Sequence, residues 1–330
     1  MSTDDAPRSA AAPEQLASVI GALGELARPG APLAPLTTYR VGGAAGVLVE
    51  ATTVDDLRRV AAAVGPTSVP VLVVGRGSNL LVADAGFGGV VVTLASGDSA
   101  SGCFDSIEID GARVTAGGAA ALPVVARRTA AAGLRGFEWA VGVPGSVGGA
   151  VRMNAGGHGS DMAASLVGVR LFDLRTGEDR RVSVADLHLG YRRSAVGPDE
   201  VVVAAELALE AGERAAAEAL VAEIVAWRRA NQPGGANAGS VFTNPPGDSA
   251  GRLIDTAGGR GRRHGTAEVS VRHANFIQAD PGGSADDIDA LMAELVALVS
   301  ATHGVALTPE TRRVGFPGTL GGPPPDGGVS

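Results

Sequence analysis

Three short segments in the second half of the chain carry side chains suited to acid–base or charge-stabilising chemistry. LGYRRS places Tyr191 beside Arg192, whose guanidinium can hold a carboxylate through two parallel hydrogen bonds. NAGSVFTNP carries the Ser240 hydroxyl and Asn244 among small residues, and LTPETRR places Glu310 ahead of two arginines. Taken singly, LGYRRS is more typical of a solvated basic turn. NAGSVFTNP also fits a turn that enters a strand, and LTPETRR also fits a surface ion pair worth ~0–1 kcal/mol.

A glycine-rich segment in the first half, VVGRGSNLLVAD, is suited to binding a phosphate. A buried-strand pattern runs into a turn that contains Gly75 and Gly77. Glycines let the backbone approach a ligand closely, and exposed peptide N–H groups suit an anion. The dinucleotide fingerprint GxGxxG is not met, because Leu80 occupies its third glycine position and a strand follows where a helix is needed. An ordinary glycine turn between strands remains an equal alternative.

A second glycine-rich segment is VGVPGSVGGAVRMNAGG, in which Gly145, Gly148 and Gly149 lie close to Ser146. It is a second candidate cradle for an anion or a planar cofactor. The stretch from 136 to 159 contains too many glycines for a regular element, yet it carries apolar residues. We therefore expect a packed functional loop rather than a flexible linker.

Composition excludes several kinds of chemistry. All 27 basic residues are arginine, so a lysine Schiff base and a Walker A lysine are excluded. Cys103 is the single cysteine, which excludes intramolecular disulfides and cysteine-ligated metal sites. The five histidines show no ligand spacing such as HExxH, so we expect no metal.

Charge and hydropathy indicate where the protein works. The net charge of −8 argues against binding to nucleic acid or to an anionic membrane. The acidic N-terminus has no apolar region of the signal-peptide kind, and the longest apolar runs are strand-sized. We expect a soluble cytoplasmic protein with no membrane insertion.

The elements that must position these segments alternate strand and helix patterns, which predicts an α+β or mixed α/β architecture. Strands are expected at 45–51, 69–74, 79–84, 89–94 and 201–209, hairpins around Asp110–Gly111 and Thr176–Gly177, and helices at 16–26, 54–64, 121–134, 215–229, 249–257 and 284–302. A boundary near residue 210 is expected, with the helix after it opening a second unit.

The order of these segments resembles the UDP-N-acetylenolpyruvoylglucosamine reductase family. That pattern begins with TTYRVGG and continues with GRGSNLLV, GVPGSVGGAVRMNAG, GYRRS and AGSVFTNP, ending at Glu310. The match covers about residues 35–315. Each segment is moderately specific, and six in the correct order are strongly specific.

The resemblance implies an α+β fold that composition could not supply. It consists of an FAD-binding module of the vanillyl-alcohol-oxidase type, made of two α+β subdomains, and a smaller C-terminal α+β substrate domain. The implied boundaries are 1–34 for an N-terminal tail and helix, 35–210 for the FAD-binding domain, 211–316 for the substrate domain and 317–330 for a disordered tail. The short connection between GYRRS and AGSVF is similar to the form of the family that lacks an extra substrate-covering insertion.

The resemblance also implies a cofactor, non-covalent FAD, and NADPH as the hydride donor. The residues that match the family's cofactor segments are Gly75, Arg76, Gly77, Ser78, Asn79, Leu80, Pro144, Gly145, Ser146, Gly148, Gly149 and Asn154. Two positions depart from the family pattern. Arg152 and His158 stand where aromatic residues are common.

The implied reaction reduces the enolpyruvyl ether of UDP-N-acetylglucosamine to UDP-N-acetylmuramate, a step of peptidoglycan precursor synthesis. By resemblance, Arg192 stabilises the enolate, Glu310 assists as a neutral acid and Ser240 donates the proton. The residues expected to hold the nucleotide sugar are Tyr191, Arg228 and Asn244.

Two other functions stay open on sequence grounds. A flavin oxidase of the same module would usually carry a histidine or cysteine for covalent flavin attachment, and the first glycine segment has neither. A non-catalytic nucleotide-sugar binding protein would have no need of Arg192, Ser240 and Glu310 together.

Overall fold

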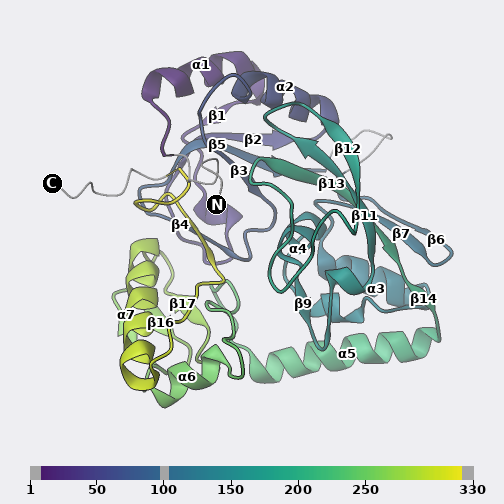
Figure 1. The fold of residues 1–330 in the computed structure, drawn as a ribbon, viewed down its shortest axis with the longest axis vertical. Coiled ribbons are helices and arrows are strands. Elements are labelled where there is room, and N and C mark those ends of the chain that lie inside the picture. The colour runs from purple at the N-terminus through teal and green to yellow at the C-terminus, as the bar shows by residue number, and fades with distance from the viewer. Residues whose placement is uncertain (1–8, 97–103, 322–330) are drawn as a thin grey trace.

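The first subdomain is a four-stranded sheet with two helices on one face (Figure 1). The structure, a computed structural model, describes residues 9–96 and 104–321; Cys103 and the outer parts of both predicted tails lie outside these ranges. The strand order is β1 (Arg28–Pro29), β2 (Ala45–Ala51), β5 (Phe87–Leu94) and β3 (Val71–Val74), and β2, β5 and β3 run parallel. Helices α1 (Pro13–Leu23) and α2 (Val54–Val64) cover it.

The second subdomain is a five-stranded antiparallel sheet, and both predicted hairpins form in it. Its strands, in spatial order, are β12 (Asp179–Ser183), β11 (Leu166–Asp173), β13 (Glu200–Ala208), β7 (Arg113–Gly117) and β6 (Ile107–Asp110). Phe172 and Val201 of this sheet share a buried core with Val49 and Val92 of the first. The two subdomains therefore pack directly against each other and share part of one hydrophobic core.

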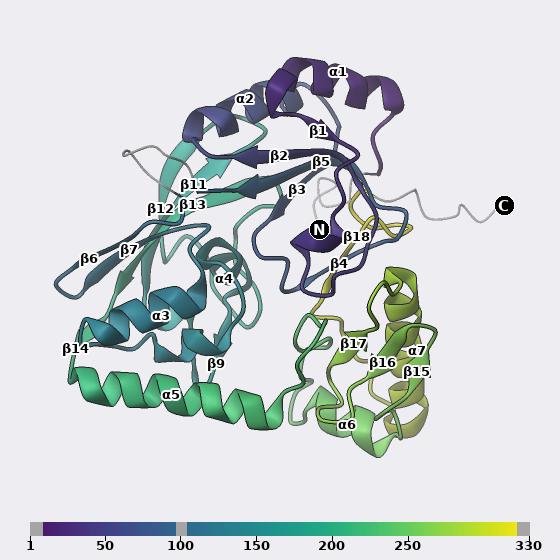
Figure 2. The same ribbon diagram turned by 180° about the vertical axis from the view of Figure 1, so that it is seen from behind.

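Helices and short elements cover the second sheet on the side seen below it in Figure 2. The helices are α3 (Leu122–Ala131), α4 (Val147–Met153) and α5 (Arg214–Asn231). The short elements are β8 (Leu134–Arg135), η4 (Glu138–Gly142), β9 (Gly156–Gly157), β10 (Ser160–Asp161), η5 (Met162–Ala164) and β14 (Glu210–Ala211). Two others, η2 (Gly24–Leu26) and η3 (Ala34–Leu36), lie in the first subdomain.

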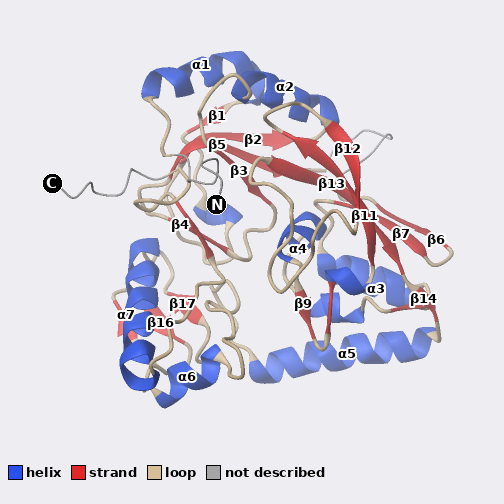
Figure 3. Cartoon of the chain, in the orientation of Figure 1, coloured by secondary structure: helices blue, strands red, loops and turns tan. Residues whose placement is uncertain are grey.

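A small α+β unit follows, with α6 (Ala250–Thr256), α7 (Ala285–His303) and the strands β15 (Arg263–His264), β16 (Ala267–Val269) and β17 (Ile277–Ala279) (Figure 3). Its core includes Tyr39 and Val41 of the TTYRVGG segment. The chain then returns to the first subdomain, where β18 (Arg312–Val314) pairs in parallel with β4 (Leu80–Val82). This return brings the segment around Glu310 beside the first glycine-rich segment.

The prediction of an irregular loop at 136–159 was wrong, because η4 and α4 both form within it. Ser146 caps α4 by accepting a hydrogen bond from the Gly149 N–H at 3.4 Å. A Cβ at Gly148 would lie 3.1 Å from the Gly118 carbonyl oxygen. The glycine is there for close packing of the helix on the sheet, not for flexibility.

The prediction that helix α5 begins the C-terminal unit was wrong, because the helix packs against the second subdomain. Its buried residues Ala217, Val221 and Ile224 join the core of the second subdomain, against α3 and η4. Packing therefore favours a boundary at the end of α5, near 231, over the predicted 210. The predicted disordered tail also begins too early, since the Gly88 N–H donates to the Gly321 carbonyl at 3.0 Å.

Candidate active site

The turn after β3 is fixed by backbone contacts. Gly77 has φ +59°, and a Cβ there would lie 2.0 Å from the Leu36 carbonyl oxygen. The Thr38 N–H donates to the Gly77 carbonyl at 3.2 Å. A larger residue at Gly77 would therefore disturb the chain itself, so its effect on a cofactor could not be separated from its effect on folding.

The two predicted glycine-rich segments meet each other. A Cβ at Gly75 would lie 2.3 Å from the Ser146 hydroxyl, so only glycine lets the first segment approach α4 this closely. Gly149, in contrast, is exposed, and a Cβ there would meet only the Ser146 hydroxyl at 3.5 Å. Glycines of similar appearance in the sequence thus have different surroundings.

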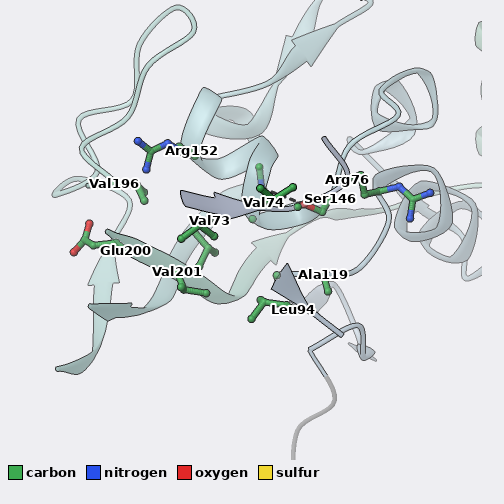
Figure 4. A pocket seen from close by; sticks show the side chains of 15 residues that line it. Val73, Val74, Arg76, Leu94, Ala119, Ser146, Arg152, Val196, Glu200 and Val201 are labelled. Carbon is green, nitrogen blue, oxygen red and sulfur yellow. Dashed lines mark hydrogen bonds between the residues drawn. The ribbon is translucent and has the colours of Figure 1, made fainter. Parts of the chain in front are cut away.

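A pocket lies between the two subdomains, bordered by this junction. Figure 4 shows Arg152 and Glu200 at one side of the view and Arg76 at the other, with Val74 and Ser146 between them. Apolar side chains from both sheets and from the loop before β13 complete its walls, namely Val73, Val74, Leu94, Val196, Val201 and Val202. Apolar walls for planar rings, glycine-lined backbone and arginines for a diphosphate together fit FAD.

Several residues that line this pocket belong to no motif in the sequence. Leu94, Ala119 and Val201 line it, yet apolar strand residues look like ordinary core. Gly118 also lines the pocket, and a Cβ there would lie 1.8 Å from the Val202 carbonyl oxygen, so only glycine fits at this position. Arg152 also lines the pocket; burial and the neighbouring Arg312 lower its pKa to about 10.

The remaining predicted cofactor residues take up mixed positions. Leu80 is buried in β4 within the core, and Pro144 is exposed. Ser78 lies near Gly145, where a Cβ would be 3.5 Å from the Ser78 hydroxyl. The Asn154 amide nitrogen donates to the Gly190 carbonyl and to the Asp161 carboxylate, both at 3.1 Å. Asn154 therefore ties the end of α4 to the loop that carries Arg192, and a role toward the cofactor stays a prediction.

The candidate reaction centre is built around an ion pair between Arg192 and Glu310. The Arg192 Nε atom lies 2.6 Å from a Glu310 carboxylate oxygen, and both side chains are largely buried. Burial raises the pKa of Glu310, and the neighbouring guanidinium of Arg192 opposes that rise. Arg192 also has φ +55°, a conformation that L residues rarely adopt and that is enriched at functional sites.

Hydrogen bonds connect this pair to the other predicted segments. The Asn79 side-chain amide donates to the Glu310 carbonyl at 3.0 Å, which joins the cofactor turn to the LTPETRR segment. The Glu310 N–H donates to the Val241 carbonyl at 2.8 Å, next to Ser240 in sequence. The structure thus brings together the three predicted catalytic segments and the cofactor turn.

Ser240 is half-buried, and its hydroxyl makes no hydrogen bond to any residue within 9–96 or 104–321. A hydroxyl that is not engaged by the protein is available to a ligand. Since its neighbour Val241 bonds to Glu310, the hydroxyl belongs to the segment that borders the ion pair.

The predicted substrate residues are less closely gathered. Tyr191 is 61% exposed, with the Arg192 guanidinium 5.3 Å from its ring centre. Arg228 is half-buried near the end of α5, where burial lowers its pKa, and its Nε donates to Gln232 at 2.7 Å. The Asn244 side chain accepts a hydrogen bond from the Ala250 N–H at 3.1 Å and so anchors the start of α6.

Within the part of the chain that the structure describes, no set of three or more histidine, cysteine, aspartate or glutamate side chains is arranged to hold a metal ion. None of the described helices combines the length and apolar character needed to cross a membrane.

Comparison with known proteins gives matches along most of the chain. A family model described as an FAD binding domain matches residues 45–183, and one described as the C-terminal domain of UDP-N-acetylenolpyruvoylglucosamine reductase matches residues 231–314. These matches confirm the predicted fold class, an FAD-binding module of the vanillyl-alcohol-oxidase type with a smaller C-terminal domain.

Individual proteins match at greater length. A UDP-N-acetylenolpyruvoylglucosamine reductase of Acidiphilium cryptum is 44% identical over 87% of this chain and 90% of its own. One from Paramagnetospirillum magneticum is 42% identical over 87% and 91%. The crystal structure of the reductase from Thermus caldophilus covers 87% of this chain and 99% of its own, with 35% identity and a TM-score of 0.75.

Proposed function

Because the chain belongs to the UDP-N-acetylenolpyruvoylglucosamine reductase family of FAD-dependent oxidoreductases in peptidoglycan precursor synthesis, we propose the specific reaction that it catalyses. It uses NADPH to reduce the enolpyruvyl ether of UDP-N-acetylglucosamine to UDP-N-acetylmuramate. The observation that carries this proposal is the meeting of Arg192, Glu310 and the Ser240 segment beside the cofactor turn.

The chemistry that FAD supplies when bound is two-electron hydride transfer, from NADPH and then to the methylene carbon of the enol ether. The protein must stabilise the negative charge that spreads into the substrate carboxylate. Arg192 is suited to this, because a guanidinium stays cationic and matches a carboxylate in shape. Its charge is held in a largely buried site, where it acts more strongly than in water.

Glu310 has a role that depends on protonation. Without substrate, its carboxylate forms an ion pair with the guanidinium of Arg192. A substrate carboxylate that binds Arg192 competes with Glu310 for this cation and adds a like charge beside it. Both effects add to burial in raising the pKa of Glu310, so the protonated acid can donate a hydrogen bond to the developing enolate.

Ser240 is the proposed proton donor to the carbon next to the carboxylate. A serine hydroxyl is a weak acid, but a carbanionic centre is a strong base, so the transfer is reasonable when the geometry is fixed. The unengaged hydroxyl and the backbone bond from Glu310 to Val241 support this assignment.

Arg228 is proposed to bind the diphosphate of the nucleotide sugar, since the chain contains no lysine to do so. Tyr191 is exposed beside Arg192, where its ring can cover a bound ligand. Asn244 is proposed as a further contact to the sugar nucleotide. Its oxygen is already bonded to Ala250, so its amide N–H₂ group remains for the ligand.

The test is the flavin absorbance of purified protein under anaerobic conditions. NADPH should bleach the flavin, and the enolpyruvyl substrate should then restore the oxidised spectrum with formation of UDP-N-acetylmuramate. Reoxidation by oxygen alone, with no effect of the substrate, would favour a flavin oxidase. A colourless protein that binds the nucleotide sugar would favour a non-catalytic binding protein.

A further inference from the structure

The backbone that follows the proposed proton donor is buried, and each of its polar groups is hydrogen-bonded. Val241 and Phe242, which come directly after Ser240, are both buried. The Val241 carbonyl accepts the Glu310 N–H at 2.8 Å. The other three groups, namely the Val241 N–H and the Phe242 N–H and carbonyl, all bond to Asn275. The chain beside Ser240 is therefore held chiefly by one residue from a distant part of the sequence.

Asn275 meets this backbone with both its side chain and its main chain. Its Oδ1 accepts the Phe242 N–H at 3.0 Å, and its Nδ2 donates to the Phe242 carbonyl at 2.8 Å. Its own carbonyl accepts the Val241 N–H at 2.9 Å. The side-chain amide can have only this orientation, because the N–H needs an acceptor and the carbonyl needs a donor. A buried polar network in which every member is satisfied in this way is rigid.

Asn275 is itself held in place by the loop that joins β16 to β17. Its side chain is 4% exposed, and its N–H donates to Nδ1 of His273 at 3.2 Å. The His273 ring contacts Phe276 edge-on, with 4.7 Å between the ring centres. Burial lowers the pKa of His273, which favours the neutral ring whose Nδ1 can accept this bond. The amide of Asn275 is therefore fixed before any ligand binds.

The chain on the other side of Ser240 is less restrained. Gly239 precedes Ser240 with φ +77°, and no atom lies within 4 Å of its Cβ position. The Gly239 N–H donates to Oδ1 of Asn237 at 3.0 Å, a contact within the same turn. Because glycine is conformationally permissive, the place of the Ser240 hydroxyl depends mainly on the residues that hold the chain after it.

We propose that Asn275 is a positioning residue for the reduction of the enolpyruvyl ether, and that it holds the Val241–Phe242 backbone so that the Ser240 hydroxyl stays where it can protonate the substrate carbon; this assignment rests on the proposed function. Both polar atoms of the Asn275 side chain are bonded to Phe242, so Asn275 acts through the backbone and not on the substrate. The bond from Glu310 to Val241 means that the same contacts set the spacing between the acid and the proton donor.

Asn275→Ala in the FAD-loaded protein is the first test, because it removes both side-chain hydrogen bonds. Flavin reduction by NADPH should keep its wild-type rate, since that half-reaction takes no proton from Ser240. Reoxidation by the enolpyruvyl substrate, followed by anaerobic stopped-flow absorbance, should slow about 10- to 100-fold, the cost of misplacing a catalytic group by about 1 Å. The loss should appear in the rate at saturating substrate more than in KM.

Asn275→Asp gives a second variant, of nearly the same shape, whose effect depends on pH. A neutral carboxylic acid can accept the Phe242 N–H and donate to the Phe242 carbonyl as the amide does, whereas a carboxylate cannot donate. Burial raises the pKa of such a carboxyl, so the ratio of the variant's reoxidation rate to the wild-type rate should rise as the pH falls through that pKa. Both proteins contain Glu310 and His273, so taking the ratio at each pH cancels the titration of these two groups.

Ser270→Ala is the matched control. Ser270 is 1% exposed in the same loop, and its hydroxyl accepts the Arg272 N–H at 3.2 Å, a bond within the loop itself. This variant should have a lower melting temperature than the wild type and should keep both half-reaction rates.

Three results would overturn the role of Asn275 while substrate-dependent reoxidation in the wild type upholds the proposed function. These are wild-type reoxidation in Asn275→Ala, equal slowing of both half-reactions, and equal slowing in the control Ser270→Ala. If Asn275→Ala does not fold, Asn275→Asp decides, and a low rate ratio that does not change with pH would overturn the role. Wild-type protein whose reduced flavin does not respond to the enolpyruvyl substrate would instead overturn the proposed function, and the assignment with it.

Discussion

The proposed cofactor side and the proposed substrate side of this site differ in the kind of group that forms them. The cofactor side is mainly backbone, where Gly75, Gly77 and Gly148 permit approaches of 2.0–3.1 Å that a Cβ would block. The substrate side consists of side chains, with Arg192 and Glu310 paired at 2.6 Å. Changes on the first side should therefore affect cofactor binding or folding, and changes on the second should affect one chemical step.

Gly149→Leu should have the largest effect that is free of folding damage. Gly149 lines the pocket and is exposed, and its Cβ position meets only the Ser146 hydroxyl, at 3.5 Å, an ordinary contact, so a leucine should occupy the pocket without a clash in the protein. The variant should purify without flavin. Its apo form should be as stable as the apo wild type or up to about 1 kcal/mol more stable, since leucine favours helix over glycine.

Gly21→Leu is the control for that variant, because Gly21 is exposed in α1 with nothing within 4 Å of its Cβ position. It should gain similar stability and keep its flavin. Retention of stoichiometric flavin by Gly149→Leu would show that the cofactor lies elsewhere.

Arg192→Ala should lower kcat about 10²- to 10³-fold, the usual cost of one lost donor to a developing oxyanion. Flavin reduction by NADPH should be unaffected, because that half-reaction leaves the substrate carboxylate untouched. Rapid-kinetic measurement of each half-reaction separates the two. Near-normal turnover would remove Arg192 from the reaction centre.

Glu310→Gln should have the smallest effect, a loss of less than about tenfold in rate, because an amide still donates a hydrogen bond and a change in one such bond is worth about 0.5–1.5 kcal/mol. Burial raises the pKa of Glu310, and only its protonated form donates. In the wild type, the substrate half-reaction should therefore slow as pH rises through that pKa. In the glutamine variant this dependence should disappear, and a pH profile identical to the wild type would argue against the role.

Motif order was sufficient to predict the two-part fold, because each motif requires particular residue types at fixed spacing, and it selected three candidate catalytic segments that the structure brings together. Packing was not predictable in the same way. The glycines of α4 looked like a loop because the sequence does not show that Gly118 and Val202 lie against Gly148. Likewise, α5 has an apolar stripe, and only the tertiary contacts show that this stripe faces α3 and η4.

The sequence also could not predict which charged residues line the candidate cofactor pocket. Arg152 was noted as a departure from a common aromatic, yet its place in the pocket wall depends on β13 and the loop before it. Apolar positions such as Leu94 and Val201 carry no motif at all. Positions that belong to a motif could therefore be selected from the sequence, whereas positions that only contribute to a shared pocket surface could not.

Ser240→Ala tests the central claim most directly, because it removes one hydroxyl from the side-chain-built half of the site. NADPH should still bleach the flavin, and reoxidation by the enolpyruvyl substrate, followed by stopped-flow absorbance, should stall for lack of a proton donor. Ser240→Cys keeps an acidic proton at the same place and should retain part of the rate. Reoxidation of the alanine variant at the wild-type rate would contradict the account, since the proton would then come from another group.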